Sequence, residues 1–395
     1  RYDPQSYGTI FEDTLVNAAD TLDNGSADLN AKFVDISQME YGGFVQLQRK
    51  FFADKLKLMG SLRIDKNENF DMQMSPRLSA SYNLNGHVFR ISGQSAFRSP
   101  TLQNQYIYLD VGPLIIAGNR KGWNNLYTLE SLDLFNNYLD SVSNPLTPEA
   151  WFDEAYDSAA VLLDTFAAEP IRPEQVKTIE LGYRGILFKK LYIDLGFYHN
   201  WYTDFIGEIR VVRPLGEAQA GTSTGLDQLA SGYHGPSEDH YQLYQIPVNA
   251  KDEVRSMGFT AGVAYHINNK YTAKANYTWA KLVTDDLDDP IIPGFNTPEH
   301  KVNVGFQGRK IWKGLGFGLQ FQWVDSFLWQ STFGDGVVPW YHTVDAQLSY
   351  ELTKYYTTLR VGASNITNHD RIEAYGSPNI GRMIYGSITF DISKL

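Results

Sequence analysis

Large apolar and small polar residues alternate along residues 315–323, which read LGFGLQFQW. Successive side chains of a β-strand point to opposite faces, so this pattern predicts a strand with one apolar face and one small, polar face. In a soluble sandwich such an apolar face packs in the core. In an outer-membrane barrel it contacts lipid, and the polar face lines a wet lumen. This strand alone is consistent with both architectures.

The same alternation recurs along the chain and predicts 14 strands, of which the first covers Tyr2–Leu15. Many of these strands are about ten residues long or more, above the usual length in soluble sheets. In a membrane barrel their apolar positions would face lipid. The residues assigned to the lipid side are Leu195, Phe259, Val263, Phe317, Phe321 and Trp323.

The connections between the strands alternate between two lengths. Tight turns are predicted at residues 53–54, 85–86, 189–190, 268–269, 312–313 and 353–354. Longer loops are predicted at 16–38, 99–173, 207–250, 283–296, 329–337 and 368–379. This segregation is typical of an antiparallel, up-and-down transmembrane β-barrel with short periplasmic turns and long extracellular loops, and a soluble sandwich has no reason for it. We therefore predict an all-β membrane barrel.

The two longest loops, 99–173 and 207–250, are large enough to hold structure of their own. In the first, Thr147 followed by Pro148 predicts a helix that begins there and runs to about Phe166, because Thr is a good N-cap and Pro fits the first helical turn. The second is rich in Gly, Ser and Tyr, and we expect it to fold over the mouth of the barrel.

Composition narrows the class of protein. The net charge of −11 argues against a general affinity for nucleic acid. There is no run of about 18 apolar residues, so a spanning helix is not expected. The chain has 25 Tyr, 22 Phe and 8 Trp, and Tyr and Trp favour boundaries between apolar and wet surroundings. Cysteine is absent, which excludes disulfides, thiolate metal sites and cysteine catalysis.

No catalytic motif is found in the sequence: it has neither a Gly-x-Ser-x-Gly elbow nor a phosphate-binding glycine-rich loop. We therefore expect no enzyme and no cofactor. One cluster has metal-ligand types, His234, Glu238, Asp239 and His240, and a second acidic run covers 285–289. We interpret both as solvated loops and predict no metal site.

Three arginines are predicted on the polar faces of their strands: Arg98, Arg184 and Arg309. Such arginines either bind anionic ligands or pair with carboxylates inside a wet lumen. The second explanation is the ordinary one.

Several segments resemble motifs of the TonB-dependent outer-membrane receptor barrel. Residues 96–102 (AFRSPTL) resemble F-R-(A/S)-P-(T/S)-L, and 171–174 (IRPE) with 180–184 (ELGYR) resemble L-K-P-E and E-L-G-Y-(K/R). Residues 197–206, with FYHN and DFI, are similar to F-Y-N-x-Y-x-D-F-I. The segments SNITN at 364–368 and GSP to GR at 376–382 resemble the family's last loop and strand.

The resemblance implies a bacterial outer-membrane protein with a 22-stranded barrel, an N-terminal plug and a TonB-type energy-coupling complex. The 14 predicted strands would be roughly strands nine to 22. Plug, coupling segment and early strands would then be absent from this sequence. The implied partners are outer-membrane lipid, the plug and remaining strands, the coupling complex and, in one branch of the family, a surface lipoprotein.

The resemblance also implies import of a scarce ligand: a siderophore, cobalamin, a glycan or a peptide. Stacking and cationic residues of the long loops, and one at a nearby strand end, are the candidates to bind it. They are Tyr106, Tyr108, Arg120, Trp123, Tyr202, Tyr241 and Tyr244. Loop packing explains the same residues equally well.

Two alternatives remain open from the sequence. One is a passive outer-membrane porin or substrate channel, which would lack a large plug. The other is a soluble all-β carbohydrate-binding or structural protein, which would need no detergent.

Overall fold

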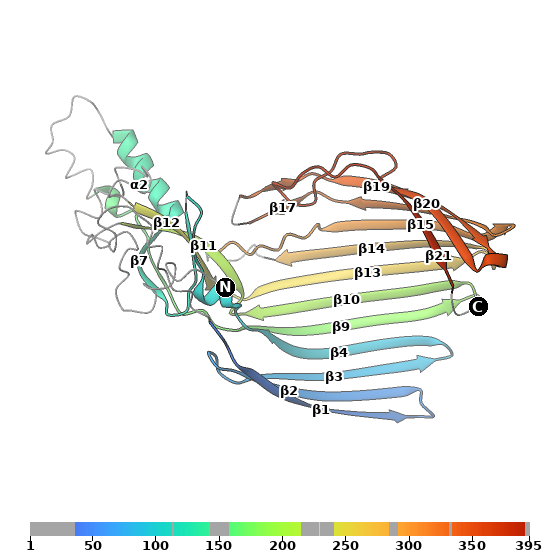
Figure 1. Cartoon of the computed structure of the whole chain (residues 1–395). Coiled ribbons are helices and arrows are strands. Elements are labelled where there is room, and N and C mark those ends of the chain that lie inside the picture. The colour runs from blue at the N-terminus through green and yellow to red at the C-terminus, as the bar shows by residue number, and fades with distance from the viewer. Residues whose placement is uncertain are drawn as a thin grey trace.

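The computed structural model describes residues 36–112, 114–142, 158–214, 229, 241–283, 291–331 and 334–391. About half of the described residues form a 13-stranded antiparallel sheet, here called the wall sheet (Figure 1). In order, its strands are β1 (Glu40–Phe51), β2 (Leu56–Asn67), β3 (Gln73–Leu84), β4 (His87–Arg98), β9 (Glu174–Leu187), β10 (Leu191–Thr203), β13 (Val254–His266), β14 (Tyr271–Val283), β15 (His300–Trp312), β16 (Leu315–Val324), β19 (Tyr341–Leu352), β20 (Thr357–Ser364) and β21 (Met383–Phe390).

Neighbours in the wall sheet follow one another along the chain, with only loop strands between them, so the predicted up-and-down topology is confirmed. All six predicted tight turns join paired strands at one end of the sheet, which we call the turn end. Asn85 and Gly86 have φ of 52° and 89°, the left-handed geometry that an Asn-Gly hairpin turn requires. Thirteen of the 14 predicted strands are seen. The first, Tyr2–Leu15, lies outside the described residues.

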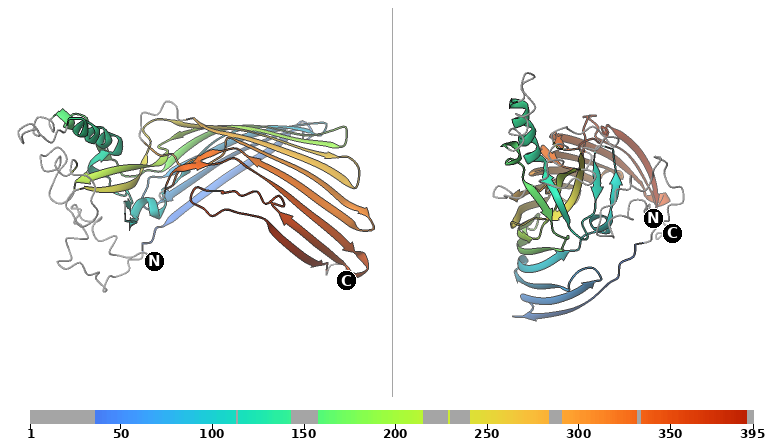
Figure 2. Two further views of the ribbon diagram at one scale, coloured as in Figure 1. Left: turned by 90° about the horizontal axis from the view of Figure 1, so that it is seen from above. Right: turned by 90° about the vertical axis from the view of Figure 1, so that its left-hand side faces the viewer.

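The wall sheet curves into a trough (Figure 2), and its two faces differ in chemistry. One face is apolar and exposed: Leu348 keeps 53% of its surface and Leu319 48%. The pairing register places all six residues that the sequence assigns to the lipid side on this face: Leu195, Phe259, Val263, Phe317, Phe321 and Trp323. The opposite face carries Ser, Thr, Asn, Gln, Gly and charged side chains. Within the described residues, no helix is long and apolar enough to span a membrane.

A second sheet stands beyond the other end of the wall strands, the loop end (Figure 1). This loop sheet has six strands in the order β5 (Tyr108–Asp110), β6 (Ile115–Ala117), β12 (Tyr241–Asn249), β11 (Ile206–Pro214), β7 (Trp123–Thr128) and β8 (Thr165–Ala168). Two helices accompany it, α1 (Leu102–Tyr106) and α2 (Leu129–Val142). A short hairpin of β17 (Phe327–Trp329) and β18 (Gly336–Val338) also lies at the loop end.

The loop sheet has a buried apolar core, unlike the wall sheet. Its ten buried residues are Ile115, Ala117, Trp123, Leu126, Ala168, Ile209, Val211, Tyr244, Ile246 and Val248. They come from both of the longest predicted loops. These loops therefore form one packed unit and do not lie separately on the rim.

Two details of the loops differ from the sequence-based expectation. The C-terminal end predicted for the helix from Thr147 to Phe166 is wrong. The chain turns at 161–162 and enters β8 at Thr165, so the last residues of the predicted helix are not helical. Residues 143–157 lie outside the description. Helix α2 was not predicted, although two of its own residues, Leu132 and Phe135, are buried and are three positions apart, as expected for one face of a helix.

Candidate functional site

Three of the segments that resemble family motifs meet where the wall sheet joins the loop sheet. Arg98, from the first motif, donates from Nη2 to Oε2 of Glu174, in the second, at 2.7 Å. The same carboxylate oxygen accepts the backbone N–H of Ile206, in the third, at 2.9 Å. Glu174 is only 6% exposed. A buried carboxylate with a cationic partner and a backbone donor is well satisfied, and it fixes the start of β11 against β4 and β9.

A second set of contacts closes the same junction from the side of β12. Arg172 Nη2 lies 2.8 Å from Asp204 Oδ1, and its backbone N–H donates to Asn249 Oδ1 at 2.8 Å. Asn249 Nδ2 in turn donates to the carbonyl of Asp204 at 2.7 Å. Side-chain hydrogen bonds thus hold Ile206 to Glu174 of β9, and Asn249 to the residues that lie just before β9 and just after β10.

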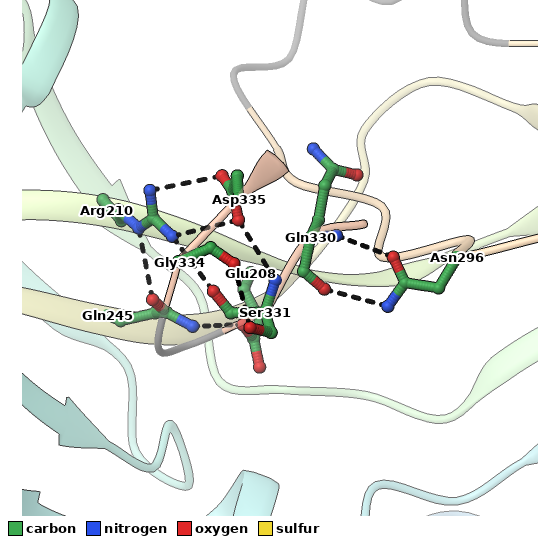
Figure 3. Close-up of polar contacts among 8 residues, drawn as sticks. All are labelled: Glu208, Arg210, Gln245, Asn296, Gln330, Ser331, Gly334 and Asp335. Atoms are coloured by element: carbon green, nitrogen blue, oxygen red, sulfur yellow. Dashed lines mark hydrogen bonds and ion pairs between the residues drawn. The ribbon is translucent and has the colours of Figure 1, made fainter. Parts of the chain in front are cut away.

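Arg210 on β11 ties the loop sheet to the β17–β18 hairpin (Figure 3). Its two terminal nitrogens each lie 3.4 Å from a carboxylate oxygen of Asp335, and Nη2 donates to the carbonyl of Ser331 at 3.2 Å. Its Nε donates to Gln245 Oε1 at 3.3 Å. A single guanidinium therefore bridges β11, β12 and the hairpin, which uses the fixed fork of donors that arginine provides.

The segment 291–299 joins this network (Figure 3). Asn296 exchanges two hydrogen bonds with the backbone of Gln330, at 2.7 and 2.9 Å. The backbone of Ile292 pairs with that of Glu208 on β11. The β17–β18 hairpin is consequently linked to β11 both directly and through this segment.

Glu208 lies inside the same network, and burial raises the pKa of its carboxyl above the ordinary value. Gln245 donates a hydrogen bond to it and Arg210 attracts its charge, and both effects lower the pKa. Asp335 repels its charge. Desolvation is the largest of these effects, so the Glu208 carboxyl holds its proton more tightly in the folded protein than an ordinary glutamate does.

On the opposite flank, Asn69 in the β2–β3 connection ties the loop sheet to the wall. Its Nδ2 donates to Gln105 Oε1 at 2.8 Å and to Tyr106 Oη at 3.0 Å, at the end of α1. Arg120 donates to Asn69 Oδ1 at 3.4 Å and lies over the ring of Phe70 at 6.0 Å. The loop sheet is therefore fastened to the β2–β3 side and to the β17–β18 hairpin.

Three of the residues predicted to bind ligand lie together in the loop-sheet core. Trp123 is 6% exposed and Tyr244 4%, with ring centroids 5.2 Å apart. Tyr108 packs against this core and its hydroxyl bonds to that of Tyr244. Burial raises the pKa of both phenols, so they stay neutral. Trp123 and Tyr244 thus present almost no surface in this conformation.

The other four predicted ligand residues are spread over the loop end. Tyr241 packs beside α2, and Tyr202 stacks edge-on against Phe205 at 5.5 Å. Tyr106 and Arg120 are half-buried around Asn69. Their contact with ligand stays a prediction. Asn69, Arg210 and Asp335 were not predicted, because isolated polar residues carry no periodic signal.

No group of three or more His, Asp or Glu side chains in the described residues is arranged to hold a metal ion. The candidate ligands His234, Glu238, Asp239 and His240 lie outside the described residues, as does the acidic run 285–289.

Comparison with known proteins supports the same family as the sequence motifs. The sequence model described as TonB dependent receptor-like, beta-barrel, matches residues 2–366. A comparison with curated proteins finds no match.

Several solved structures share the fold. The FrpB iron transporter from Neisseria meningitidis has 12% identity and a TM-score of 0.56, over 89% of this chain and 45% of that one. A mutant of the ferric enterobactin receptor PfeA from Pseudomonas aeruginosa has 13% identity and a TM-score of 0.57, over 89% and 44%. The copper transporter OprC has 14% identity and a TM-score of 0.56, over 89% and 47%. The chain thus spans less than half the length of these structures.

Proposed function

Since the chain belongs to the family of TonB-dependent receptor-like β-barrels, we propose that it forms part of a receptor that imports a scarce ligand with energy from a TonB-type complex. Proteins of this family are β-barrels of the bacterial outer membrane, and the wall sheet is the membrane-barrel part of this one. The family match over residues 2–366 carries the proposal. A passive porin gains no support from it.

The architecture of the loop end supports a receptor. The two longest loops combine into one sheet with its own core, and Asn69 and Arg210 fasten that sheet on two sides. Binding surfaces are generally built from loops that a rigid scaffold positions. In this proposal the loop sheet supplies the outer wall of the ligand site, with Tyr106 and Arg120 near its surface.

The ligand class remains one of four: a siderophore, cobalamin, a glycan or a peptide. The printed names of similar structures include an iron transporter, a ferric enterobactin receptor and a copper transporter, which favours a chelated metal as the first to test. We infer that the chain performs no chemistry on the ligand. In this proposal the plug, the remaining strands, membrane lipid and the coupling complex are its partners, and a surface lipoprotein stays a prediction.

The test is uptake by cells that carry the full-length receptor, with and without a functional coupling complex. Radiolabelled ferric siderophores, cobalamin, glycans and peptides are offered separately. One class should accumulate only when receptor and coupling complex are both present. Uptake that persists without the coupling complex would indicate a passive channel and contradict the proposal.

The ligand surface can be examined in the same assay. Arg120→Ala and Tyr106→Ala should each reduce uptake of that ligand severalfold at equal receptor abundance. Tyr355→Ala is the matched control, because Tyr355 is an exposed tyrosine at the opposite, turn end of the wall sheet.

A further inference from the structure

The polar face of the wall sheet is not uniformly charged. On β2, β3, β4 and β9 it carries six cations: Lys57, Arg63, Arg77, Arg90, Arg98 and Arg184. On β13 to β16 the same face is dominated by Gly, Ser, Thr, Asn and Gln. Cationic character is therefore concentrated on one side of the trough.

Half of these six cations are already neutralised by carboxylates. Arg63 pairs with Asp65 at 2.7 Å, Arg98 with Glu174 at 2.7 Å and Arg184 with Asp194 at 2.6 Å. The pairing that the sequence analysis favoured for arginines of this face is thus found for Arg98 and Arg184.

Lys57, Arg77 and Arg90 differ from the other three. Lys57 and Arg77 form no ion pair in the described part of the chain. Arg90 lies 3.8 Å from Asp194, whose carboxylate already accepts the shorter contact from Arg184. These three side chains are exposed on the polar face and carry charge that the described residues do not balance.

All three line one groove of about 410 Å³ on the polar face. The floor is low because Gly182 and Gly196 have no side chains, and the guanidinium of Arg90 lies over Gly182. Serine hydroxyls of β3 and β4 line the space between the cations. The groove contains one carboxylate, Glu180, which accepts a hydrogen bond from Ser92 at 2.9 Å. Its charged side chains therefore sum to an excess of positive charge.

The register fixes how far apart the three cations lie. Lys57 is opposite Ser81 and Ser81 is opposite Arg90, so Lys57 and Arg90 are two strand spacings apart, about 10 Å. Arg77 is four residues before Ser81 on β3, about 13 Å along the strand. Flexible side chains from three such positions can converge on one small molecule between them.

We propose that this groove binds a small ligand with several carboxylate groups, on the route that an imported molecule takes along the lumen wall. Clustered Arg and Lys side chains on the wall of a pore favour anions, and a partly enclosed cleft concentrates their field. The opposite wall, on β13 to β16, offers mainly amides and hydroxyls and carries Lys274 and Lys301 outside the groove. The inference rests on the proposed function, because that function makes the polar face a transport lumen.

The experiment uses the full-length receptor in detergent, titrated calorimetrically with citrate as the probe. The test variant combines Lys57→Gln, Arg77→Gln and Arg90→Gln. The control combines Lys274→Gln, Lys301→Gln and Arg360→Gln, which removes three cations from the same face outside the groove. Loss of three partly exposed ion pairs should weaken citrate binding about tenfold or more in the test variant, with less than about a twofold change in the control.

Three outcomes overturn the inference. In the first, the wild-type receptor does not bind citrate. In the second, both variants lose affinity equally, which would mean that citrate responds only to the overall electrostatic potential of the lumen. In the third, citrate binds only after the N-terminal region is deleted, which would make the groove a seat for that region. A failure of the proposed function, energised import, gives a different result from a failure of this inference. Citrate binding that depends on the groove, in a receptor whose uptake needs no coupling complex, keeps this inference and contradicts energised import.

Discussion

The wall sheet and the loop sheet use the same alternation of apolar and polar residues with opposite results. In the loop sheet the apolar side chains are buried in a core: Leu126 and Ile246 have no exposed surface. In the wall sheet the apolar side chains of Leu319 and Leu348 stay about half exposed. A period of two therefore identifies a strand, but only the surroundings decide whether its apolar face is a core or a surface for lipid.

The difference also explains how the two sheets are held together. The wall sheet gains its lateral stability from long backbone ladders between neighbouring strands. The loop sheet has short strands and depends on its core and on polar fasteners such as Glu174, Arg210 and Asn69. It is the part of the molecule in which single side chains should matter most.

The largest effect is expected in the loop-sheet core. Leu126→Ala should cost about 2–5 kcal/mol of local stability, because a cavity forms where neighbours cannot refill the space. Leu348→Ala on the lipid side should cost about 1–2 kcal/mol, since lipid fills the gap and only the transfer free energy is lost. Hydrogen exchange at β11 and β12, and refolding into bilayers, measure the two. Equal costs would mean that both leucines share one kind of environment.

A smaller effect separates the two faces of one wall strand. Leu319 and Gln320 are adjacent near the middle of β16 and point to opposite faces. Leu319→Arg should cost about 2–4 kcal/mol in a bilayer, and Gln320→Arg far less. Phe317→Arg, nearer the turn end, should fall between them because the cost declines toward the interface. Similar values at positions 319 and 320 in bilayer refolding would refute the assigned faces.

The sequence predicted the wall sheet well because its signal repeats. Every strand repeats the alternation, and every tight turn separates two such strands. The loop sheet has no comparable repeat: β5, β6 and β8 are short, and β6 pairs with β12, which lies more than a hundred residues away. Trp123 and Tyr244 were read as ligand residues for their chemistry, whereas their burial depends on that long-range pairing.

The junction between the sheets was accessible from the sequence only through resemblance. Arg98, Glu174 and Asp204 were each singled out in a motif, but nothing in the spacing showed that their segments meet. Asn69 and Arg210 lie outside any motif and could not be found.

A moderate effect is expected at this junction. Glu174→Ala should destabilise the attachment of β11 by about 1–3 kcal/mol, because the Ile206 N–H loses its acceptor and Arg98 its partner. Glu253→Ala removes an exposed partner of Arg255 and should change stability by less than about 0.5 kcal/mol. Hydrogen exchange at Ile206 reports the difference. Equal protection in the two variants would show that the buried pair does not hold the junction.

The smallest expected effect is a pH dependence of stability that is limited to the loop sheet. Because burial raises the pKa of Glu208, the folded protein binds its proton more tightly than the unfolded chain does. The contribution of Glu208 is therefore fully present below the ordinary glutamate pKa and falls as pH rises through the raised value in the folded state. Glu208→Gln should remove this dependence and slow exchange at β11 near neutral pH, while the wall strands stay unchanged.

The measurement is hydrogen exchange of β11 and β12 between about pH 4 and 8, corrected for the intrinsic rate. A wild-type loop sheet that becomes more stable as pH rises, with the slope retained in Glu208→Gln, would show that the network is governed by the Arg210–Asp335 pair and not by the buried carboxyl.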